Sequence, residues 1–434
     1  MDGPREQAVG GRRWTAADLL AVLAGVVVVV VAVSPIAARW LGNEPDQRLV
    51  DLEVYREGGR AILRGAPLYD VLTQPPQFLP FTYPPFAAVL AVPFTVMPWR
   101  AAQLVWTGLI CVALVICVRY AFRDLIRRTG RWAPLTTGVL VAAMAWLDPV
   151  RDQFRFGQVG VFLLALCLAD CCARAPRWPR GALVGLAVAI KLVPGVFLIY
   201  FLITGRRDAL GNALFTAAAA TLGGFALLPH DSSDYWFGAL LQGGDRTGAV
   251  DGTTNQAVQG IVARILPEGP ARTLVWLVLA LIVAYWGFVW ARRASEAAEL
   301  RTGADSSSLL LASVAIVGLL SVVLSPVGWI HHLVWMIAVF GALAGDGRDV
   351  RRCLAAFGLW FLFLFPVPWW GRSLIGPEHS VISEFAGQVT RDLFGIAALA
   401  SIVVLGTWLI GRTEPGIADE DPSQPEVRMG TLSP

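Results

Sequence analysis

Charged side chains are scarce in this sequence, and lysine is almost absent. Asp, Glu, Lys and Arg make up 15% of the 434 residues, whereas 56% are hydrophobic. A soluble domain usually has about 25% charged residues. One globule of this size cannot keep so much apolar side chain out of water, so the composition excludes an ordinary soluble protein. The net charge of +3 is too small to indicate nucleic acid as a partner.

Cysteine is also rare, and its positions exclude a disulfide framework. All six cysteines lie inside or at the edge of apolar runs, where thiols behave as small hydrophobic side chains. They are Cys111, Cys117, Cys167, Cys171, Cys172 and Cys353. No pair of cysteines has the Cys-x-x-Cys spacing of a zinc site.

Long apolar runs dominate the remainder. The first, Leu19–Ala38, has the length of about 20 residues that spans a bilayer, longer than the core of a signal peptide. Each run is expected to be a helix, because an open strand edge in lipid leaves backbone groups unpaired. The sequence therefore predicts an all-α integral membrane protein with about ten to twelve transmembrane helices. The further runs are Phe86–Phe122 (two segments broken near Pro98), Ala133–Leu147, Val159–Ala173, Ala182–Ile203, Ala209–Leu228, Thr273–Ala291, Leu309–Leu324, Leu333–Ala344, Cys353–Phe365 and Leu393–Ile410.

Arginine clusters predict the orientation, because positive charge favours the cytoplasmic side. The clusters are Arg12-Arg13, Arg206-Arg207, Arg292-Arg293 and Arg348/Arg351/Arg352. They predict a multi-pass protein of the plasma membrane, with a transmembrane domain over 1–413, cytoplasmic N- and C-termini and a disordered cytoplasmic tail over 414–434. Four stretches then face outward: the first outer loop 39–83, the large outer loop 229–271, and 325–332 and 366–392. All four histidines (His230, His331, His332, His379) lie in them.

The region 84–207 allows two topologies. A simple alternating count places 148–158 inside. Arginines on both sides of this region instead favour 148–158 outside, with 182–203 as a short hairpin whose tip holds Lys191. We favour the hairpin.

The first outer loop is the richest in polar groups. Asp51 and Tyr55 are four residues apart and share a helix face, while Val50, Val54 and Ile62 give that helix an apolar side able to lie at the interface. A carboxylate half removed from water there has a raised pKa suited to a general base. The alternative is an ordinary surface helix with solvated acids.

Lys191 is the single lysine of the chain, and it interrupts an apolar run. An ionisable group within a membrane segment costs at least ~2.5 kcal/mol on insertion, so it marks a candidate functional site. A compact ammonium is a good phosphate ligand. The alternative is snorkelling to the nearest headgroups.

Further polar groups occur where apolar runs end. Ser325-Pro326-Val327-Gly328-Trp329-Ile330-His331-His332 breaks a helix, and its two imidazoles can assist proton transfer or bind a phosphate or sugar. One of the two should point away from the site, because neighbours on a helix do not share a face. Asn255-Gln256 and Gln158 supply amides of the kind that bind hydroxyl groups, and Asp148 and Arg151 lie near Gln158.

Taken together, these motifs resemble a known family. Asp51…Tyr55…Gly65-Ala66-Pro67-Leu68-Tyr69, Phe81-Thr82-Tyr83-Pro84-Pro85-Phe86, Phe156-Gly157-Gln158, Lys191-Leu192-Val193-Pro194, Asn255-Gln256 and Ser325-Pro326…Trp329…His331-His332 occur in that family's order. The sequence resembles the actinobacterial polyprenyl-phosphate-mannose-dependent α-mannosyltransferases, glycosyltransferase family 87 of the GT-C class. The resemblance implies a GT-C type polytopic helical bundle with short interfacial helices in the first outer loop.

The resemblance also implies roles for these residues. Asp51 is then the general base, His331 or His332 assists it or holds the leaving phosphate, and Lys191 binds the donor phosphate. The substrate-binding candidates are Tyr55, Tyr83, Gln158, Asn255, Gln256 and Trp329. The implied reaction moves mannose from a polyprenyl-phosphate donor to a hydroxyl group of a cell-envelope glycolipid or glycan on the outer face, with inversion to an α-mannoside.

Two alternatives remain open at this stage. The same architecture can use another polyprenyl-phosphate sugar, glucose or arabinofuranose. A lipid-sugar transporter or flippase also explains many helices and an embedded lysine, but it predicts inverted repeats and sites near the bilayer midplane, whereas no repeat is evident. No cofactor is expected, although Asp51-Leu52-Glu53 offers two carboxylates for a divalent ion.

Overall fold

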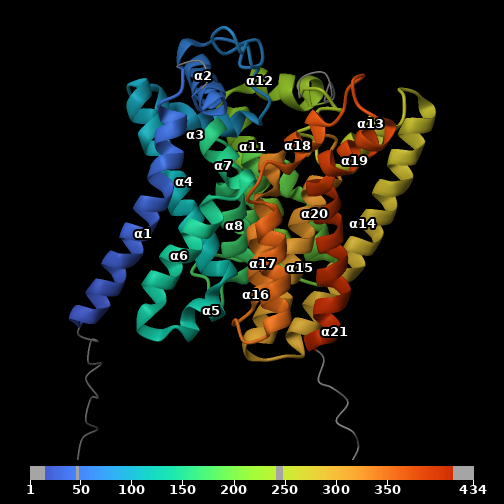
Figure 1. The fold of residues 1–434 in the computed structure, drawn as a ribbon. Helices are drawn as coiled ribbons and strands as arrows, with labels where there is room; N and C mark the ends of the chain where they lie inside the picture. The colour runs from blue at the N-terminus through green and yellow to red at the C-terminus, as the bar shows by residue number, and fades with distance from the viewer. Residues whose placement is uncertain (1–14, 45–47, 241–247, 414–434) are drawn as a thin grey trace, which may run out of the picture.

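The computed structural model describes residues 15–44, 48–240 and 248–413, and over these ranges the chain is a helical bundle (Figure 1). Pairing of the β type is limited, in these ranges, to two isolated bridges, Leu72 with Pro80 and Asn255 with Trp329. The prediction of an all-α fold is confirmed. The tail 414–434 and the Arg12-Arg13 pair lie outside the described residues.

Most helices of the first half follow the predicted apolar runs, and the others lie in the more polar segments between those runs. The helices of this half are α1 (Ala16–Leu41), α2 (Val50–Arg64), α3 (Pro85–Thr95), α4 (Trp99–Ala121), α5 (Arg123–Arg128), η2 (Gly130–Trp132), α6 (Ala133–Ala145), α7 (Asp148–Phe156), α8 (Gly160–Cys172), α9 (Ala182–Ile190), η3 (Val193–Gly195), α10 (Val196–Ile203) and α11 (Arg207–Leu227). Pro98 separates α3 from α4, as expected of a residue that lacks the N–H for a continuous helix.

The second half alternates long spans with short helices. It contains α12 (Pro229–Asp234), η4 (Tyr235–Ala239), α13 (Val258–Ile265), α14 (Pro270–Glu299), α15 (Gly303–Val323), η5 (Ile330–Trp335), α16 (Met336–Ala344), α17 (Val350–Leu362), α18 (Val367–Ser373), α19 (Val381–Arg391), α20 (Leu393–Val404), η6 (Leu405–Leu409) and α21 (Ile410–Thr413).

Length and composition identify the membrane spans. Among the described residues, six helical segments are long and apolar enough to cross a bilayer, or eight if two bent pairs each count as one span. Four shorter apolar helices accompany them: Pro85–Thr95, Gly160–Cys172, Val193–Ile203 and Ile330–Ala344. A multi-pass membrane protein is therefore the class of this fold.

The spans differ in what surrounds them. The apolar window of α15 is 83% buried, and this helix packs against α14, α16 and α20 in the centre. The windows of α11 and α14 are each only 11% buried although both helices are strongly apolar. An apolar helix that its own protein leaves uncovered requires an apolar solvent, which is the lipid bilayer.

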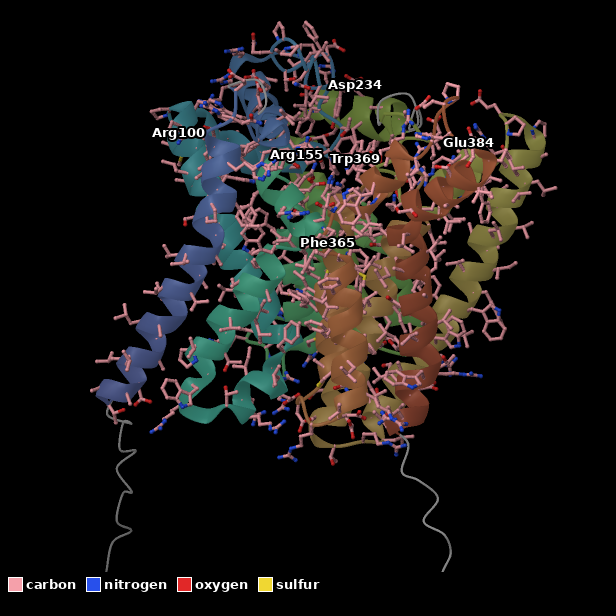
Figure 2. The ribbon with its side chains drawn as sticks, in the orientation of Figure 1. Arg100, Arg155, Asp234, Phe365, Trp369 and Glu384 are labelled. Carbon is pink, nitrogen blue, oxygen red and sulfur yellow. The ribbon has the colours of Figure 1, made fainter. Side chains whose placement is uncertain are left out.

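Short helices gather at one end of the bundle. Figure 1 shows α2, α12, α13, α18 and α19 there, while α1 begins and α21 ends at the opposite end. Arg100, Arg155, Asp234 and Glu384 lie near the first end, whereas Phe365 lies farther down the bundle (Figure 2). At the opposite end Arg352 pairs with Asp305, and Arg412 pairs with Asp349. The polar groups predicted for the outer loops thus share one end, away from the predicted cytoplasmic arginines.

The run 182–203 is broken into α9, η3 and α10. Gly181 at the start of α9 lies against Ala209 near the start of α11, so close that a Cβ atom on Gly181 would be 1.8 Å from the Ala209 carbonyl oxygen. The end of α10 is joined directly to the start of α11, and the start of α11 lies beside the start of α9. The chain therefore runs away along α9 and returns along α10 to the same end of the bundle. This path is the hairpin topology, with Lys191 at the tip.

A buried ion pair joins two short elements at the site end. Arg264 of α13 contacts the Asp392 carboxylate, with exposed side-chain fractions of 1% and 4%. Arg264 also donates to the Gly252 carbonyl, and Gln388 donates to Asp392. The pair therefore holds the loop before Asn255 against the start of α20.

Removing one partner of this pair should destabilise the protein strongly. We expect Asp392→Ala to lower the free energy of unfolding by about 3–5 kcal/mol, because it leaves the Arg264 guanidinium buried without its counter-charge. Thermal unfolding of the purified protein in detergent measures the loss. Glu268→Ala is the matched control, since Glu268 is 89% exposed in its pair with Arg272 and exposed pairs contribute about 0–1 kcal/mol. Equal melting temperatures for the two variants would contradict this role.

Candidate active site

A cavity of about 540 Å³ lies at the end of the bundle where the short helices gather. Charged and polar side chains interrupt its largely apolar wall, and it is called the polar cavity below. Elements far apart in sequence form its wall: α2, the segment 77–84, α7, the break between α9 and α10, η4 and η5. Seven of the candidates named from the sequence line it: Asp51, Tyr83, Gln158, Lys191, Trp329, His331 and His332. The structure thus brings most of the predicted site residues together.

Asp51 belongs to a hydrogen-bonded chain of side chains. The amide nitrogen of Gln158 donates to Asp51 Oδ2 over 2.7 Å, and the Tyr55 hydroxyl donates to Gln158 Oε1 over 3.3 Å. The Tyr83 hydroxyl lies 3.2 Å from that of Tyr55. Because Tyr55 uses its single proton on Gln158, Tyr83 is the donor in the last bond. Tyr55 therefore supports the Gln158 side chain and does not itself line this cavity.

A glycine allows this arrangement. Gly157 has φ of 71°, and a Cβ atom on it would lie 2.9 Å from the Cβ of Leu52 and 3.1 Å from that of Leu49. Only glycine adopts this left-handed conformation without a steric cost and leaves room for α2. The Leu49 N–H also donates to the Arg155 carbonyl. The end of α7 is thereby docked on the start of α2, which places Gln158 beside Asp51.

The surroundings of Asp51 suit a general base. Burial raises the pKa of its carboxyl to about 6, while the hydrogen bond from Gln158 and the positive charge of Lys191 act in the opposite direction. The carboxylate is thus ionised at neutral pH, yet far more basic than an exposed aspartate. Such a group can accept a proton from a hydroxyl group as that oxygen becomes a nucleophile.

Lys191 lies across the cavity at the break of the hairpin. Its backbone is extended (φ −150°, ψ 130°), and Pro194 follows in η3, so the α9 helix cannot continue. Lys191 Nζ is 3.2 Å from His332 Nε2 and 5.2 Å from the centre of the Tyr83 ring. An ammonium only donates, so in that form of Lys191 the His332 Nε2 atom is the acceptor. The position is that of a cavity wall, not of a side chain extended to a headgroup.

Both histidines line the cavity. His331 and His332 begin the 3₁₀ helix η5, with their rings edge to face at 4.6 Å. The expectation that one of them points away is wrong, because both side chains border the cavity. Gln153, which is fully buried, donates to the His331 carbonyl over 2.6 Å and accepts from the Val161 N–H. That side chain fixes η5 on α7 and α8.

Asn255 and Gln256 lie outside the cavity lining. Both are fully buried. Asn255 Oδ1 accepts from the Gly328 N–H and its amide nitrogen donates to the Pro326 carbonyl, while Gln256 accepts from Gly395 and donates to the Arg391 carbonyl. Their amides are used within the protein: Asn255 holds the segment before Trp329 and Gln256 holds the start of α20, so neither is free to contact a substrate. The sequence shows that Asn255 and Gln256 are polar, but it does not show whether their side chains face the cavity or the protein interior.

Two residues of the site were not among the candidates. Asp152 lines the cavity, and Gln153 holds η5. The signal available in the sequence was the polar stretch between two apolar runs, which also contains Asp148 and Arg151. Those two pair with each other over 2.7 Å. The helical position of the neighbouring Asp152 decides which carboxylate faces the cavity.

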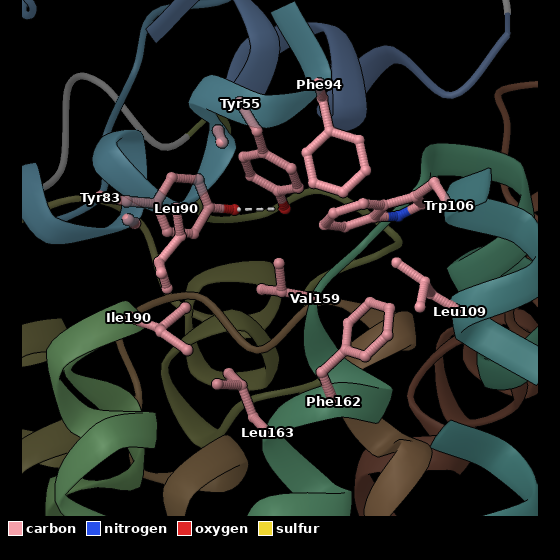
Figure 3. Close-up of a pocket in the computed structure, with 12 residues that line it drawn as sticks. Tyr55, Tyr83, Leu90, Phe94, Trp106, Leu109, Val159, Phe162, Leu163 and Ile190 are labelled. Atoms are coloured by element: carbon pink, nitrogen blue, oxygen red, sulfur yellow. Dashed lines mark hydrogen bonds between the residues drawn. The ribbon is translucent and has the colours of Figure 1, made fainter. Parts of the chain in front are cut away.

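A second cavity of about 300 Å³ adjoins the first and is apolar (Figure 3). Phe94, Trp106 and Phe162 surround it together with aliphatic side chains, and the Tyr55–Tyr83 hydrogen bond lies along one edge. Tyr83 lines both cavities. A polar space and an apolar space thus share one aromatic wall, which suits a ligand with a charged head and a hydrocarbon tail.

The two carboxylates of Asp51-Leu52-Glu53 do not both enter the cavity. Glu53, two residues after Asp51, accepts from the Gln74 N–H instead of entering the cavity. Across the described part of the chain, no group of three His, Cys, Asp or Glu side chains has the arrangement of a metal site.

Comparison with known proteins identifies the group to which this site belongs. The model of glycosyltransferase family 87 matches residues 81–326. A polyprenol-phosphate-mannose-dependent alpha-(1-2)-phosphatidylinositol mannoside mannosyltransferase of Mycolicibacterium smegmatis is 37% identical over 88% of each chain, and that of Mycobacterium tuberculosis is 37% identical over 96% of each. A pentamannoside mannosyltransferase of the former organism is 34% identical over 74% of this chain and 76% of its own. No solved structure matches.

The helical bundle, whose end cavity combines a carboxylate and an ammonium beside an apolar cavity, is therefore that of a polytopic membrane glycosyltransferase. The chain belongs to glycosyltransferase family 87.

Substitution of Gln158 tests the basicity of Asp51. The base acts when deprotonated, so activity of the wild type should fall about tenfold per pH unit below pH 6. Gln158→Leu removes a hydrogen bond that favours the ionised carboxylate, so the Asp51 pKa should rise and the acidic limb should move to higher pH. The pH dependence of kcat/KM measures the shift. Tyr55→Phe keeps the Gln158–Asp51 bond and should move the limb less, and an unmoved limb in Gln158→Leu would refute the assignment.

Proposed function

We propose that this protein transfers mannose from polyprenyl-phosphate mannose to a hydroxyl group of a phosphatidylinositol mannoside, on the outer face of the plasma membrane and with inversion to an α-mannoside. The observation that carries the proposal is a half-buried carboxylate, Asp51, facing the ammonium of Lys191 and the His332 ring across one cavity. An inverting sugar transfer requires one base for the acceptor and one cation for the departing phosphate.

The proposed reaction is a single displacement. Asp51 takes the proton of the acceptor hydroxyl group as its oxygen bonds to the anomeric carbon of the mannose. The bond from that carbon to the phosphate oxygen breaks on the opposite face, and the electron pair leaves with polyprenyl phosphate. Attack opposite the leaving group turns a β-linked donor into an α-mannoside. Lys191 neutralises the charge that develops on the phosphate, and His332, hydrogen-bonded to Lys191, orients the ammonium.

The apolar cavity supports a lipid-linked donor. Its aromatic and aliphatic lining begins at Tyr83, beside Lys191. A phosphate bound by Lys191 would therefore lie at the junction, with the sugar in the polar cavity and the first isoprene units against Phe94, Trp106 and Phe162. Such a chain comes from the bilayer, which is already apolar, so its fit in this cavity depends on packing contacts rather than on removal from water. A water-soluble sugar nucleotide would make no use of this space.

The arginine distribution supports an outward-facing site. The ion pairs of Arg352 and Arg412 lie at the end of the bundle opposite the cavity. Positive clusters favour the cytoplasmic side, so the cavity opens to the outer leaflet and both chain ends are cytoplasmic.

The names of the relatives support the acceptor. The two most fully covered ones act on phosphatidylinositol mannoside through an alpha-(1-2) linkage, and we propose the same acceptor and linkage for this chain. Other acceptors and other polyprenyl-phosphate sugars can be compared in the same transfer assay.

Transfer by the purified protein is the direct test. Incubation with radiolabelled polyprenyl-phosphate mannose and phosphatidylinositol mannosides should yield a mannoside that linkage analysis identifies as α-(1→2). Asp51→Asn should lower kcat by about 10²–10⁴-fold, because the neutral amide cannot accept the proton. Its melting temperature should stay near that of the wild type. Full activity of Asp51→Asn would remove Asp51 from the mechanism, and transfer only from the glucose or arabinofuranose donor would change the proposed sugar.

Lys191 should govern use of the donor. We expect Lys191→Ala to raise KM for polyprenyl-phosphate mannose and lower kcat, together reducing kcat/KM about 10- to 100-fold, the range for a lost charge-assisted hydrogen bond. KM for the acceptor should change much less. Steady-state kinetics with each substrate varied in turn separate the two effects. Unchanged kinetics would mean that the amine contacts no phosphate.

A further inference from the structure

Asp152 is a second carboxylate in the cavity, and the mechanism above does not use it. It lies on α7, and its side chain is 14% exposed. It lines the same wall as Asp51 and Phe156. Its nearest cation is Arg155, one turn along α7, at 3.8 Å. That distance is too long for a hydrogen bond.

The other carboxylates in and near the cavity are satisfied within the protein. Asp51 accepts from Gln158, and Asp148 accepts from Arg151. Among the described residues, no donor makes a hydrogen bond to the Asp152 carboxylate. A carboxylate largely removed from water has about four acceptor positions to fill. Protein donors within the described residues do not fill these positions, so the hydroxyl groups of a ligand can occupy them in place of water.

The position of Asp152 is fixed by its neighbours. Gln153 binds η5 and α8, the Arg155 carbonyl accepts from Leu49, and Gly157 lies against α2. Because Gln153, Arg155 and Gly157 all contact neighbouring elements, α7 has little freedom to rotate about its axis. The carboxylate of Asp152 is therefore held toward the cavity before any ligand arrives, as a binding group must be.

We propose that Asp152 is a substrate-binding residue that accepts hydrogen bonds from two vicinal hydroxyl groups of a pyranose ring in the cavity. This inference rests on the proposed function, because only a sugar substrate brings such groups there. Two adjacent hydroxyl groups match the two oxygens of one carboxylate. Both the mannose of the donor and a mannose of the acceptor carry them, and the experiment distinguishes the two sources.

Steady-state kinetics of the purified full-length protein test the proposal. Donor and acceptor are each varied at about pH 8, two units above the Asp51 pKa of about 6, so that titration of Asp51 does not affect the comparison. Asp152→Ala should raise KM for one substrate about 10- to 100-fold, the range for lost hydrogen bonds to a charged group, with less than about a threefold change in kcat. A rise in donor KM assigns the sugar to the donor, and a rise in acceptor KM assigns it to the acceptor.

Asp152→Asn keeps the shape of the side chain and one acceptor oxygen. Its KM should lie between those of the wild type and Asp152→Ala, and it reports on the proposal if the alanine variant folds poorly. Arg155→Ala is the matched control, because it breaks the 3.8 Å ion pair without removing the carboxylate. Asp70→Ala removes an exposed carboxylate outside the polar cavity. Both controls should keep KM within about twofold of the wild type.

The outcomes that overturn the proposal are specific. Unchanged KM values in Asp152→Ala and Asp152→Asn would show that no sugar contacts this carboxylate. An equal KM increase in Arg155→Ala would assign the effect to the ion pair. Failure of the proposed function looks different, because the wild type itself would then transfer no mannose under these conditions.

Discussion

The hydrogen bond between Gln158 and Asp51 is the contact on which the site depends. It joins residues 107 positions apart, and it exists because Gly157 lets α7 approach α2 without side-chain atoms between them. The bond orients the carboxylate and moderates the basicity that burial gives it. Burial alone would protonate Asp51 too readily, and full exposure would leave it a weak base. The balance between the two depends on one backbone conformation that glycine alone adopts easily.

Around this contact the structural core and the candidate site are formed by different parts of the chain. The central helix α15 and its neighbours form the buried core, whereas several site residues lie at a helix end or break: Lys191 after α9, Gln158 after α7, and the two histidines at the start of η5. Helix ends release backbone groups and let side chains converge from different directions. The buried amides of Asn255 and Gln256 and the Arg264–Asp392 pair then fix the loops that would otherwise be free to move.

Much of this architecture could be predicted from the sequence. Apolar runs long enough to span a bilayer located the helices, and a lysine within one of them marked the site, because an embedded charge is costly unless it has a use. The residues that meet were harder to predict. Lys191 and His332 are 141 positions apart, and no spacing rule gives the relative rotation of their helices. For the same reason Asn255 and Gln256 were identified as polar but assigned to a ligand, while Asp152 was missed one position from Arg151.

Lys191 also makes the polar cavity chemically distinct from the rest of the protein. The chain has no other lysine, and this one forms part of the cavity wall beside Tyr83. Every other cationic side chain apart from histidine is an arginine, which does not react as an amine. Reagents selective for primary amines, such as an aldehyde with a hydride reductant, would therefore modify one side chain only in the polar cavity, with the N-terminal amine as the remaining competitor. Occupancy of the cavity can accordingly be followed as protection of a single ε-amino group.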